Sequence, residues 1–237
     1  MEETSKKTFH VFTIPDGNRR WAKAKGLSPY EGHRQGYETL RSILKNIWSL
    51  GVTHYTFWGL SMDNFRNRPK QEISYLFGLF EEAINELLLS LELEKEKIHF
   101  QLIGRFKELC SKSLKEKIEN LEKKTSGYTD KFFTLLAGYN GDEEIEDAVT
   151  RYSKKICETG EKATWNGIRE YIWSSSLPDV DICIRTGFEP HLSAAVLSFQ
   201  MRDAHLYFPQ MHWPDYNIEE LAKIIDDFKN RERRLGA

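Results

Sequence analysis

The stretch that most constrains the fold is residues 10–21, which read HVFTIPDGNRRW. It begins with β-branched and aromatic apolar residues, which favour a buried strand. Pro15 ends strand pairing, and the Asp16-Gly17-Asn18 sequence after it is typical of a turn before a helix. A strand that passes through a tight turn into a helix leaves backbone N–H groups free at the helix start, and such groups bind anions. The sequence therefore predicts an anion site at this turn.

The charges around the turn narrow the kind of anion. Arg19 and Arg20 lie beside the free amides and favour a phosphate or diphosphate. Asp16 would repel such a ligand unless a cation lies between them. Mg²⁺ is usually held by one or two carboxylates together with phosphate oxygens, so this arrangement indicates Mg²⁺. The residues alone leave a second interpretation open, in which Asp16 is only the N-cap of the helix.

Strand-like and helix-like segments alternate along the chain, which predicts an α/β fold with a mostly parallel open sheet and helices on both faces. We expect strands at residues 11–14, 53–59, 98–103, 132–139, 180–184 and 205–208. We expect the longer helices at residues 32–50, 70–93, 110–124, 142–157, 164–173 and 218–233, and a loop at 61–69. The chain contains no linker or internal repeat, so residues 1–237 are expected to form a single domain.

Three polar residues directly follow expected strands. Asp16, Ser61 and Arg185 each lie at the carboxyl end of one. In open α/β sheets ligands bind beyond the carboxyl ends of the strands, so we expect these three side chains to converge on one rim.

Composition excludes several classes of protein. The net charge is −2 with 30% charged residues, so no basic field indicates a nucleic-acid partner. The three cysteines have no metal-like spacing, and their odd number argues against a disulfide framework. The N-terminus has no apolar signal segment, and no apolar run reaches the roughly 18 residues of a membrane span. We expect a soluble cytoplasmic protein, and a peripheral membrane contact remains open.

The segment 14–22, IPDGNRRWA, resembles the first signature of the cis-prenyltransferases, the family of undecaprenyl and dehydrodolichyl diphosphate synthases. Further blocks match in the family's order: Gly32-His33, SMDNFRNRP at 61–69, Arg185-Thr186-Gly187 with Glu189, Trp213-Pro214-Asp215 and RERRLG at 231–236. The resemblance implies condensation of an allylic prenyl diphosphate with isopentenyl diphosphate, with release of diphosphate. It also implies Mg²⁺, a homodimer and a hydrophobic tunnel for the growing chain.

The resemblance also suggests roles for individual residues. Asp16 would bind Mg²⁺ and assist departure of diphosphate, and Asn64 would take part in proton removal. The residues implied at the allylic diphosphate are Gly17, Asn18, Arg19, Arg20, Trp21, His33, Ser61 and Arg68. The expected helix 70–93 has apolar residues at helical spacing, which fits either an ordinary core face or a tunnel wall. We expect the small residues Gly59, Gly78 and Ala83 to border the tunnel.

The second diphosphate site departs from the family pattern. Arg185 matches its first arginine, but His191 and Ser193 stand where the family has a second arginine and a serine. His205 replaces a glutamate that binds metal in bacterial members, and imidazole is a poorer Mg²⁺ ligand than a carboxylate. Arg234 and Gly236 match the family's ending, which reaches across the dimer to the partner's diphosphate.

Three alternatives accompany this interpretation. The altered second site is compatible with irregular, branching coupling of two allylic diphosphates such as dimethylallyl diphosphate. A non-catalytic subunit of a heteromeric synthase would typically have lost the first signature, which this chain keeps in full. A lipid-binding module without chemistry would explain the apolar helix but not the converging arginines.

Overall fold

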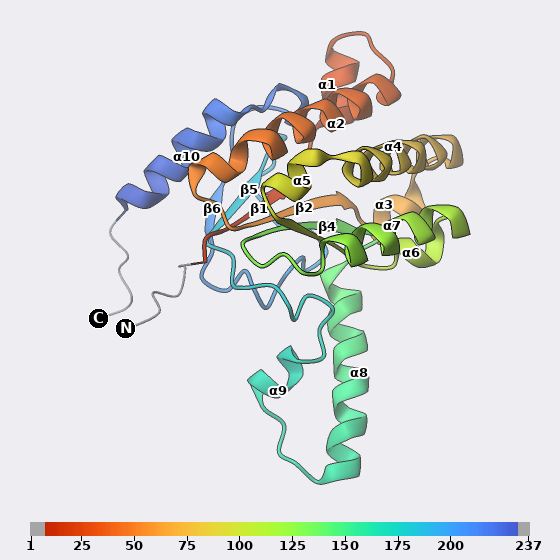
Figure 1. Ribbon diagram of the computed structural model, residues 1–237, viewed down its shortest axis with the longest axis vertical. Coiled ribbons are helices and arrows are strands. Elements are labelled where there is room, and N and C mark those ends of the chain that lie inside the picture. Colours follow the sequence, from red (N-terminus) through yellow and green to blue (C-terminus); the bar gives the residue numbers. More distant parts are fainter. Residues whose placement is uncertain (1–7, 232–237) are drawn as a thin grey trace.

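The computed structural model describes residues 8–231, and within them six strands form one sheet in the order β3-β4-β2-β1-β5-β6 (Figure 1). Every neighbouring pair in the sheet is parallel. The strands are β1 (His10–Ile14), β2 (His54–Leu60), β3 (Ile98–Ile103), β4 (Lys131–Ala137), β5 (Ile182–Arg185) and β6 (His205–Tyr207). The predicted parallel α/β sheet is confirmed, and all six strands lie where the sequence indicates them.

The strand β1 lies near the middle of the sheet, and all five of its residues are buried. Successive side chains point to opposite faces, so Val11 joins one hydrophobic cluster and Phe12 the other. A strand covered on both faces is mostly apolar, which explains Val11, Phe12 and Ile14, and the buried ring of His10 is hydrogen-bonded.

The helices cover the two faces unequally. They are α1 (Asn18–Ala24), α2 (Pro29–Asn46), α3 (Met62–Asn67), α4 (Lys70–Leu89), α5 (Leu91–Lys95), α6 (Phe106–Leu109), α7 (Lys112–Thr125), α8 (Gly141–Thr159), α9 (Trp165–Arg169) and α10 (Ile218–Asn230), with 3₁₀ turns η1 (Ile47–Leu50) and η2 (Trp213–Asp215). One face carries α2, α4, α7 and α10, whereas α8 extends away from the sheet with α9 beside it (Figure 1). Leu177, Val180, Val196 and Leu197 pack on the other face, so irregular chain covers much of the surface where helices were expected.

Local signals set several helix ends, and the structure differs from the predicted boundaries in the following places. A capping box between Ser28 and Glu31 starts α2 at Pro29, earlier than the expected residue 32. The expected helix 70–93 divides at Ser90, whose side chain accepts a hydrogen bond from the N–H of Leu93 and caps α5. The expected loop 61–69 contains α3, and the expected helix 164–173 is reduced to α9.

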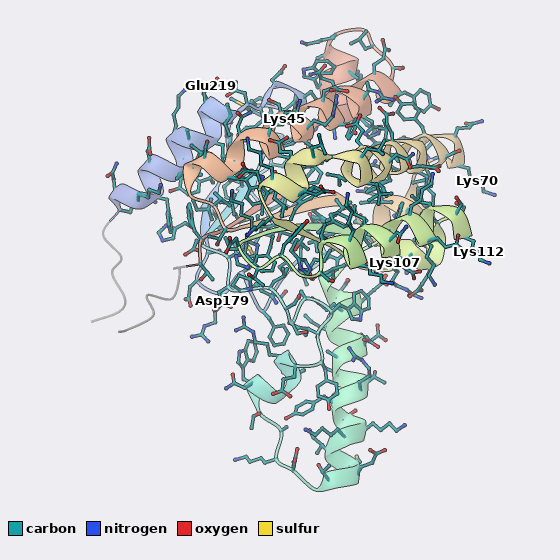
Figure 2. The ribbon with its side chains drawn as sticks, in the orientation of Figure 1. Lys45, Lys70, Lys107, Lys112, Asp179 and Glu219 are labelled. Atoms are coloured by element: carbon teal, nitrogen blue, oxygen red, sulfur yellow. The ribbon has the colours of Figure 1, made fainter. Side chains whose placement is uncertain are left out.

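The charged residues lie mainly on the outside of this framework. Lys45, Lys70, Lys112 and Glu219 are exposed and project from the outer sides of helices (Figure 2). Within residues 8–231, no helix combines the length and the apolar character needed to cross a membrane.

Candidate active site

The turn between β1 and α1 is held rigidly by its neighbours. Gly17 is the N-cap of α1 with a φ of 110°, which glycine adopts without strain. A Cβ atom there would lie 2.5 Å from Nδ1 of His212, so a larger residue would also clash. The carbonyl oxygen of Asp16 accepts hydrogen bonds from the Thr186 hydroxyl (2.8 Å) and the Trp213 N–H (3.0 Å). The turn is therefore fixed from the β5 side and from η2.

The carboxylate of Asp16 faces two guanidinium groups. Arg185 donates from Nη2 to Oδ2 at 2.8 Å, and Nη2 of Arg20 lies 3.1 Å from Oδ1. The N-cap position belongs to Gly17, and no side chain caps α1. The interpretation of Asp16 as only a helix cap is therefore wrong.

Arg185 links this turn to the segment that follows β5. It ends β5, is buried, and donates from Nη1 to the carbonyl oxygen of His191 (2.9 Å) and to Oγ of Ser193 (3.0 Å). The imidazole of His191 is half exposed and lies 3.8 Å from the carboxylate of Glu189. His191 thus contributes its backbone oxygen to Arg185, while its ring pairs outside this contact.

The end of β2 supplies the opposite wall. Ser61 follows β2, and its Oγ accepts a hydrogen bond from the N–H of Asn64 at 2.9 Å, which starts α3. Arg68 ends α3, and His33 approaches the same place from α2. Both point at Glu72, a buried carboxylate that the sequence analysis missed. The sequence did contain a signal for it, because Glu72 is an acidic residue on the apolar side of α4, one helical turn after Arg68.

One cavity of about 580 Å³ joins these walls. Its polar lining consists of Asp16, Gly17, Asn18, Arg19, Arg20, His33, Ser61, Asp63, Asn64, Arg68, Arg185 and Ser193. The predicted convergence of Asp16, Ser61 and Arg185 on one rim is confirmed. Leu76, Leu79, Phe80 and Ala83 of α4 line the same cavity and make its deeper part apolar. Such a cavity suits a ligand with an anionic head and a hydrocarbon tail.

Several polar atoms of this cavity have no protein partner. The Nε atoms of Arg68 and Arg185 and the Oδ1 atom of Asn18 are buried without a hydrogen bond to any described residue. Buried polar groups are normally paired, and an unpaired one carries a desolvation cost. Each of the two guanidinium groups therefore has one N–H donor that no described residue uses, and that nitrogen is enclosed by protein atoms.

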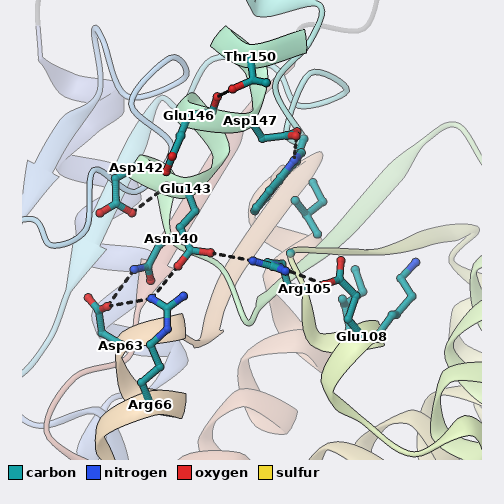
Figure 3. Close-up of a pocket in the computed structure, with 15 residues that line it drawn as sticks. Asp63, Arg66, Arg105, Glu108, Asn140, Asp142, Glu143, Glu146, Asp147 and Thr150 are labelled. Carbon is teal, nitrogen blue, oxygen red and sulfur yellow. Dashed lines mark hydrogen bonds and ion pairs between the residues drawn. The ribbon is translucent and has the colours of Figure 1, made fainter.

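A second cavity of about 1010 Å³ lies along the same edge of the sheet and shares Asp63 with the first. Figure 3 shows Arg66 between Asp63 and Glu143, and Arg105 reaching Glu143 and Glu108. Its charged lining consists of Asp63, Glu108, Asp142, Glu143, Glu146 and Asp147 against Arg66, Arg105 and Lys107. Carboxylates outnumber cations here, so this cavity is a poor place for a diphosphate.

The family model described as "Putative undecaprenyl diphosphate synthase" matches residues 14–236. The chain belongs to the cis-prenyltransferase family. It is 35% identical over 231 residues to a tritrans,polycis-undecaprenyl-diphosphate synthase (geranylgeranyl-diphosphate specific) of Methanopyrus kandleri, covering 96% of this chain and 84% of that protein. It is also 35% identical over 229 residues to an isoprenyl transferase of Thermotoga maritima, covering 96% of each chain.

A solved structure supports the same fold. Lavandulyl diphosphate synthase from Lavandula x intermedia, in complex with dimethylallyl diphosphate, superposes with a TM-score of 0.88 at 27% identity. The match covers 98% of this chain and 99% of that one. The chain is therefore a prenyl-transferring enzyme, of the class that condenses an allylic diphosphate with isopentenyl diphosphate.

Two further predicted site residues of this cis-prenyltransferase, Trp21 and His205, lie away from the cavity. The indole of Trp21 donates from Nε1 to Asp215 at 2.7 Å, which ties α1 to η2. His205 lies in β6 with its ring edge-on to Phe228, at a centroid distance of 5.0 Å. Neither residue lines the cavity. Arg234 and Gly236 lie outside the described residues.

The donor set around Asp16 fits Mg²⁺ only with the help of a ligand. Within residues 8–231, no group of three His, Cys, Asp or Glu side chains is arranged to hold a metal ion. Mg²⁺ commonly uses one or two carboxylates, with phosphate oxygens and water as its other ligands. The Asp16 side chain is 31% exposed and lines the cavity, so it can provide that carboxylate.

Proposed function

We propose that the cavity beside Asp16 binds an allylic prenyl diphosphate with its diphosphate among the arginines and its hydrocarbon chain along α4. The observation that carries this proposal is the continuity of one cavity from four guanidinium groups to an apolar wall. A diphosphate needs charge-assisted donors, and a prenyl chain needs apolar surface.

The positions of the arginines suggest a division of labour. Arg19, Arg20, His33 and Arg68 would surround the allylic diphosphate, with the backbone amides after Gly17. Arg185 and Ser193 would hold the diphosphate of the second substrate. As the carbon–oxygen bond of the allylic unit breaks, negative charge gathers on the departing diphosphate, and these fixed donors would stabilise it.

Two residues are assigned to the remaining chemistry. Asp16 would hold Mg²⁺, which neutralises charge on the leaving diphosphate. Asn64 lines the cavity after β2, where it would assist removal of the proton from the isopentenyl unit. Removal of the metal with EDTA should stop turnover, and added Mg²⁺ should restore it.

The name of one relative suggests which allylic diphosphate starts the reaction. The Methanopyrus relative is named as specific for geranylgeranyl diphosphate. We therefore propose geranylgeranyl diphosphate as the preferred allylic substrate and a long polyprenyl diphosphate as the product.

A second candidate reaction is irregular coupling of two allylic diphosphates. The structure of lavandulyl diphosphate synthase was solved with dimethylallyl diphosphate and superposes closely on this chain. In addition, Arg185 contacts the backbone of His191 where the family has a second arginine. A less firmly held second diphosphate would accept either five-carbon unit. His191→Arg should then raise the preference for isopentenyl diphosphate over dimethylallyl diphosphate.

We also propose that the enzyme is a cytoplasmic homodimer whose tail serves the partner's site. The described cysteines Cys110, Cys157 and Cys183 are free thiols, which suits a reducing compartment. Deletion of residues 234–237 should raise the apparent KM for one substrate and leave the dimer intact, because a dimer needs a larger surface than a short tail supplies. Unchanged kinetics of the truncated protein would contradict this assignment. A truncated protein that is monomeric in analytical ultracentrifugation would contradict it as well.

The decisive experiment is a matrix of substrates. Purified protein is incubated with Mg²⁺ and either isopentenyl or dimethylallyl diphosphate, each paired with allylic diphosphates of five to twenty carbons. Products are identified by mass spectrometry and NMR. We expect elongation of geranylgeranyl diphosphate by isopentenyl diphosphate. Absence of product from every pair would refute the proposal, and branched product from dimethylallyl diphosphate alone would select the second candidate.

A further inference from the structure

Glu72 is a buried carboxylate behind the wall of the catalytic cavity. It lies in the first turn of α4 and is 5% exposed. Buried carboxylates are rare unless they are paired. The positive end of the α4 dipole favours its charge, and the rest of its stabilisation must come from neighbouring cations.

Three cationic or protonatable groups from three different elements surround this carboxylate. His33 of α2 lies closest, with Nε2 2.9 Å from Oε1. Nη1 of Arg68 is 3.5 Å from the same oxygen, and Nη1 of Arg19 in α1 is 3.8 Å from Oε2. Glu72 therefore lies behind three groups that all line the cavity.

Glu72 is the partner that these three side chains share. Arg19 and Arg68 carry like charges on neighbouring elements, and each disfavours the other. The Arg19 side chain is 56% exposed and free to turn toward water. His33 is buried, which lowers its pKa, so near neutral pH its single proton is held on Nε2 by the carboxylate. Glu72 thus sets the position of both arginines and the tautomer of the histidine.

We propose that Glu72 is a positioning residue that assembles Arg19, His33 and Arg68 into a preformed binding wall for the allylic diphosphate. The inference rests on the proposed function, because it takes these three groups as the allylic diphosphate site. A preformed wall spares the ligand the cost of ordering three side chains from separate elements. Glu72 itself does not line the cavity, so it acts through them.

The proposal and a simple charge argument predict opposite changes in the affinity for the allylic diphosphate when Glu72 is replaced. The direction of the measured change therefore tests the proposal. Glu72→Gln removes one negative charge from a site that binds an anion. If Glu72 were only a counter-charge, its loss would tighten binding of the allylic diphosphate. If it positions the cations, its loss weakens that binding even though the site becomes more positive.

The experiment measures the binding of geranylgeranyl diphosphate by calorimetry and the steady-state KM of both substrates. For Glu72→Gln we expect the allylic Kd to rise by roughly tenfold, the scale of one charge-assisted contact. The KM for isopentenyl diphosphate should stay within about twofold, because Arg185 holds that site. The matched control is Glu82→Gln on the same helix, whose carboxylate pairs with Arg34 at 2.6 Å outside the cavity. It should change neither constant.

Further variants separate positioning from a general loss of structure. Glu72→Asp keeps the charge on a shorter side chain, so we expect a smaller but still selective rise in the allylic Kd. In an Arg19→Gln background, Glu72→Gln should have a reduced effect, because part of what it positions is gone. If Glu72→Gln does not fold, Glu72→Asp decides the question on its own.

The contrary outcomes are distinct. Unchanged or tighter allylic binding in Glu72→Gln and Glu72→Asp would overturn the proposal, and so would equal rises for both substrates. If the wild-type protein itself neither binds nor turns over an allylic diphosphate, it is the proposed function that fails.

Discussion

Two cavities lie side by side at the carboxyl edge of the sheet, and they differ in what their charges can do. The larger, of about 1010 Å³, contains six carboxylates and three cations. The smaller, of about 580 Å³, has four arginines and a histidine against Asp16 and Asp63. Family membership and the proposed chemistry point to the smaller one. Volume alone would have selected the larger one.

The balance of charge explains the difference. Arginines in both cavities pair with carboxylates: Arg66 with Glu143 at 2.8 Å and Arg105 with Glu108 at 3.0 Å in the larger one, and Arg185 with Asp16 at 2.8 Å in the smaller one. Carboxylates are in excess in the lining of the larger cavity, whereas cations are in excess in the lining of the smaller one. In the smaller cavity Arg68 and Arg185 each keep a buried Nε without a partner among the described residues. An anion gains most where donors are ordered but not fully used.

The largest expected effect is on kcat, and it compares an acidic residue of the smaller cavity with one of the larger cavity. Asp16→Ala should lower kcat by roughly 10²–10³, the usual effect of losing a group that stabilises transition-state charge. Asp142→Ala is the control, because Asp142 is exposed and lines only the larger cavity. It should leave kcat unchanged. Because Asp16 also neutralises the buried Arg185, Asp16→Asn is measured alongside, with thermal unfolding as the check on folding. Near-normal turnover of both Asp16 variants would remove Asp16 from the catalytic assignment.

The next effect compares arginines. Arg185→Gln should raise the KM for isopentenyl diphosphate by roughly 10- to 100-fold, the range expected for a charged hydrogen-bonding partner. Arg105→Gln, in the larger cavity, should leave both KM values unchanged because Arg105 is already committed to Glu108. Initial-rate kinetics with each substrate varied in turn measures both. If Arg105→Gln raised a KM as much as Arg185→Gln, the distinction between the cavities would be lost.

A smaller effect concerns product length, and here the structure revises the sequence-based expectation. Gly59 and Ala83 line the cavity beside Asp16. Gly78 does not: it borders a shallow groove between α2 and α4, and a Cβ atom there would touch nothing within 4 Å. Gly78 therefore lies outside the cavity that is proposed to hold the prenyl chain.

Gly78 and Ala83, which lie on the same helix, provide a matched test. Ala83→Leu should shorten the product by one or more isoprene units while the first condensation keeps its rate. Gly78→Leu, one and a half turns earlier on the same helix, should leave product length unchanged. Chromatography of radiolabelled products distinguishes the two. Equal shortening by both variants would show that the cavity assigned here does not set product length.

The smallest expected effect on the cavities comes from residues at the amino edge of the sheet, which influence the stability of the fold. His10 is fully buried there, with Nε2 2.8 Å from the Thr56 hydroxyl and Nδ1 3.0 Å from the carbonyl of Pro178. Burial lowers its pKa to about 3, and burial also lowers that of His54 to about 4. Both rings are neutral in the folded protein near neutral pH.

The sign of the resulting pH dependence is fixed. Between the ordinary pKa of 6.5 and the lowered value, the unfolded chain binds protons that the folded chain refuses. The stability from His10 is therefore full above about pH 6.5 and is lost as the pH falls toward 3, at up to about 1.4 kcal/mol per pH unit. Denaturant unfolding at a series of pH values measures the slope, and His10→Gln should reduce it. An unchanged slope in that variant would assign the acid sensitivity elsewhere.

Much of the fold and part of the site follow from local sequence. The strand, turn and helix at residues 10–24 lie where the pattern predicts them, because apolar β-branched residues, Pro15 and Gly17 act over short range. Asp16, Ser61 and Arg185 meet as expected because parallel strands end at one edge of the sheet. These inferences need only the positions of the strands in the sequence and their parallel arrangement. They do not depend on how the side chains pack.

Contacts between distant residues could not be read in this way. That Glu72 faces Arg19, His33 and Arg68 depends on how α1, α2 and α4 pack against each other. The ring of His191 turns to Glu189 while its carbonyl serves Arg185, a choice made by the backbone of an irregular segment. Gly78 and Ala83 both lie on α4, yet they border different spaces.

The sequence by itself determined the type and order of the elements and the chemistry carried to the edge of the sheet, since those depend on periodicity and on residues near each other in the chain. Only the tertiary structure decided which arginines stay available, which acid stands behind them and which side of α4 meets the cavity. Those properties depend on distances between segments far apart in the chain, such as Asp16 and Thr186, which are 170 residues apart. Local sequence does not specify such distances; side-chain packing does.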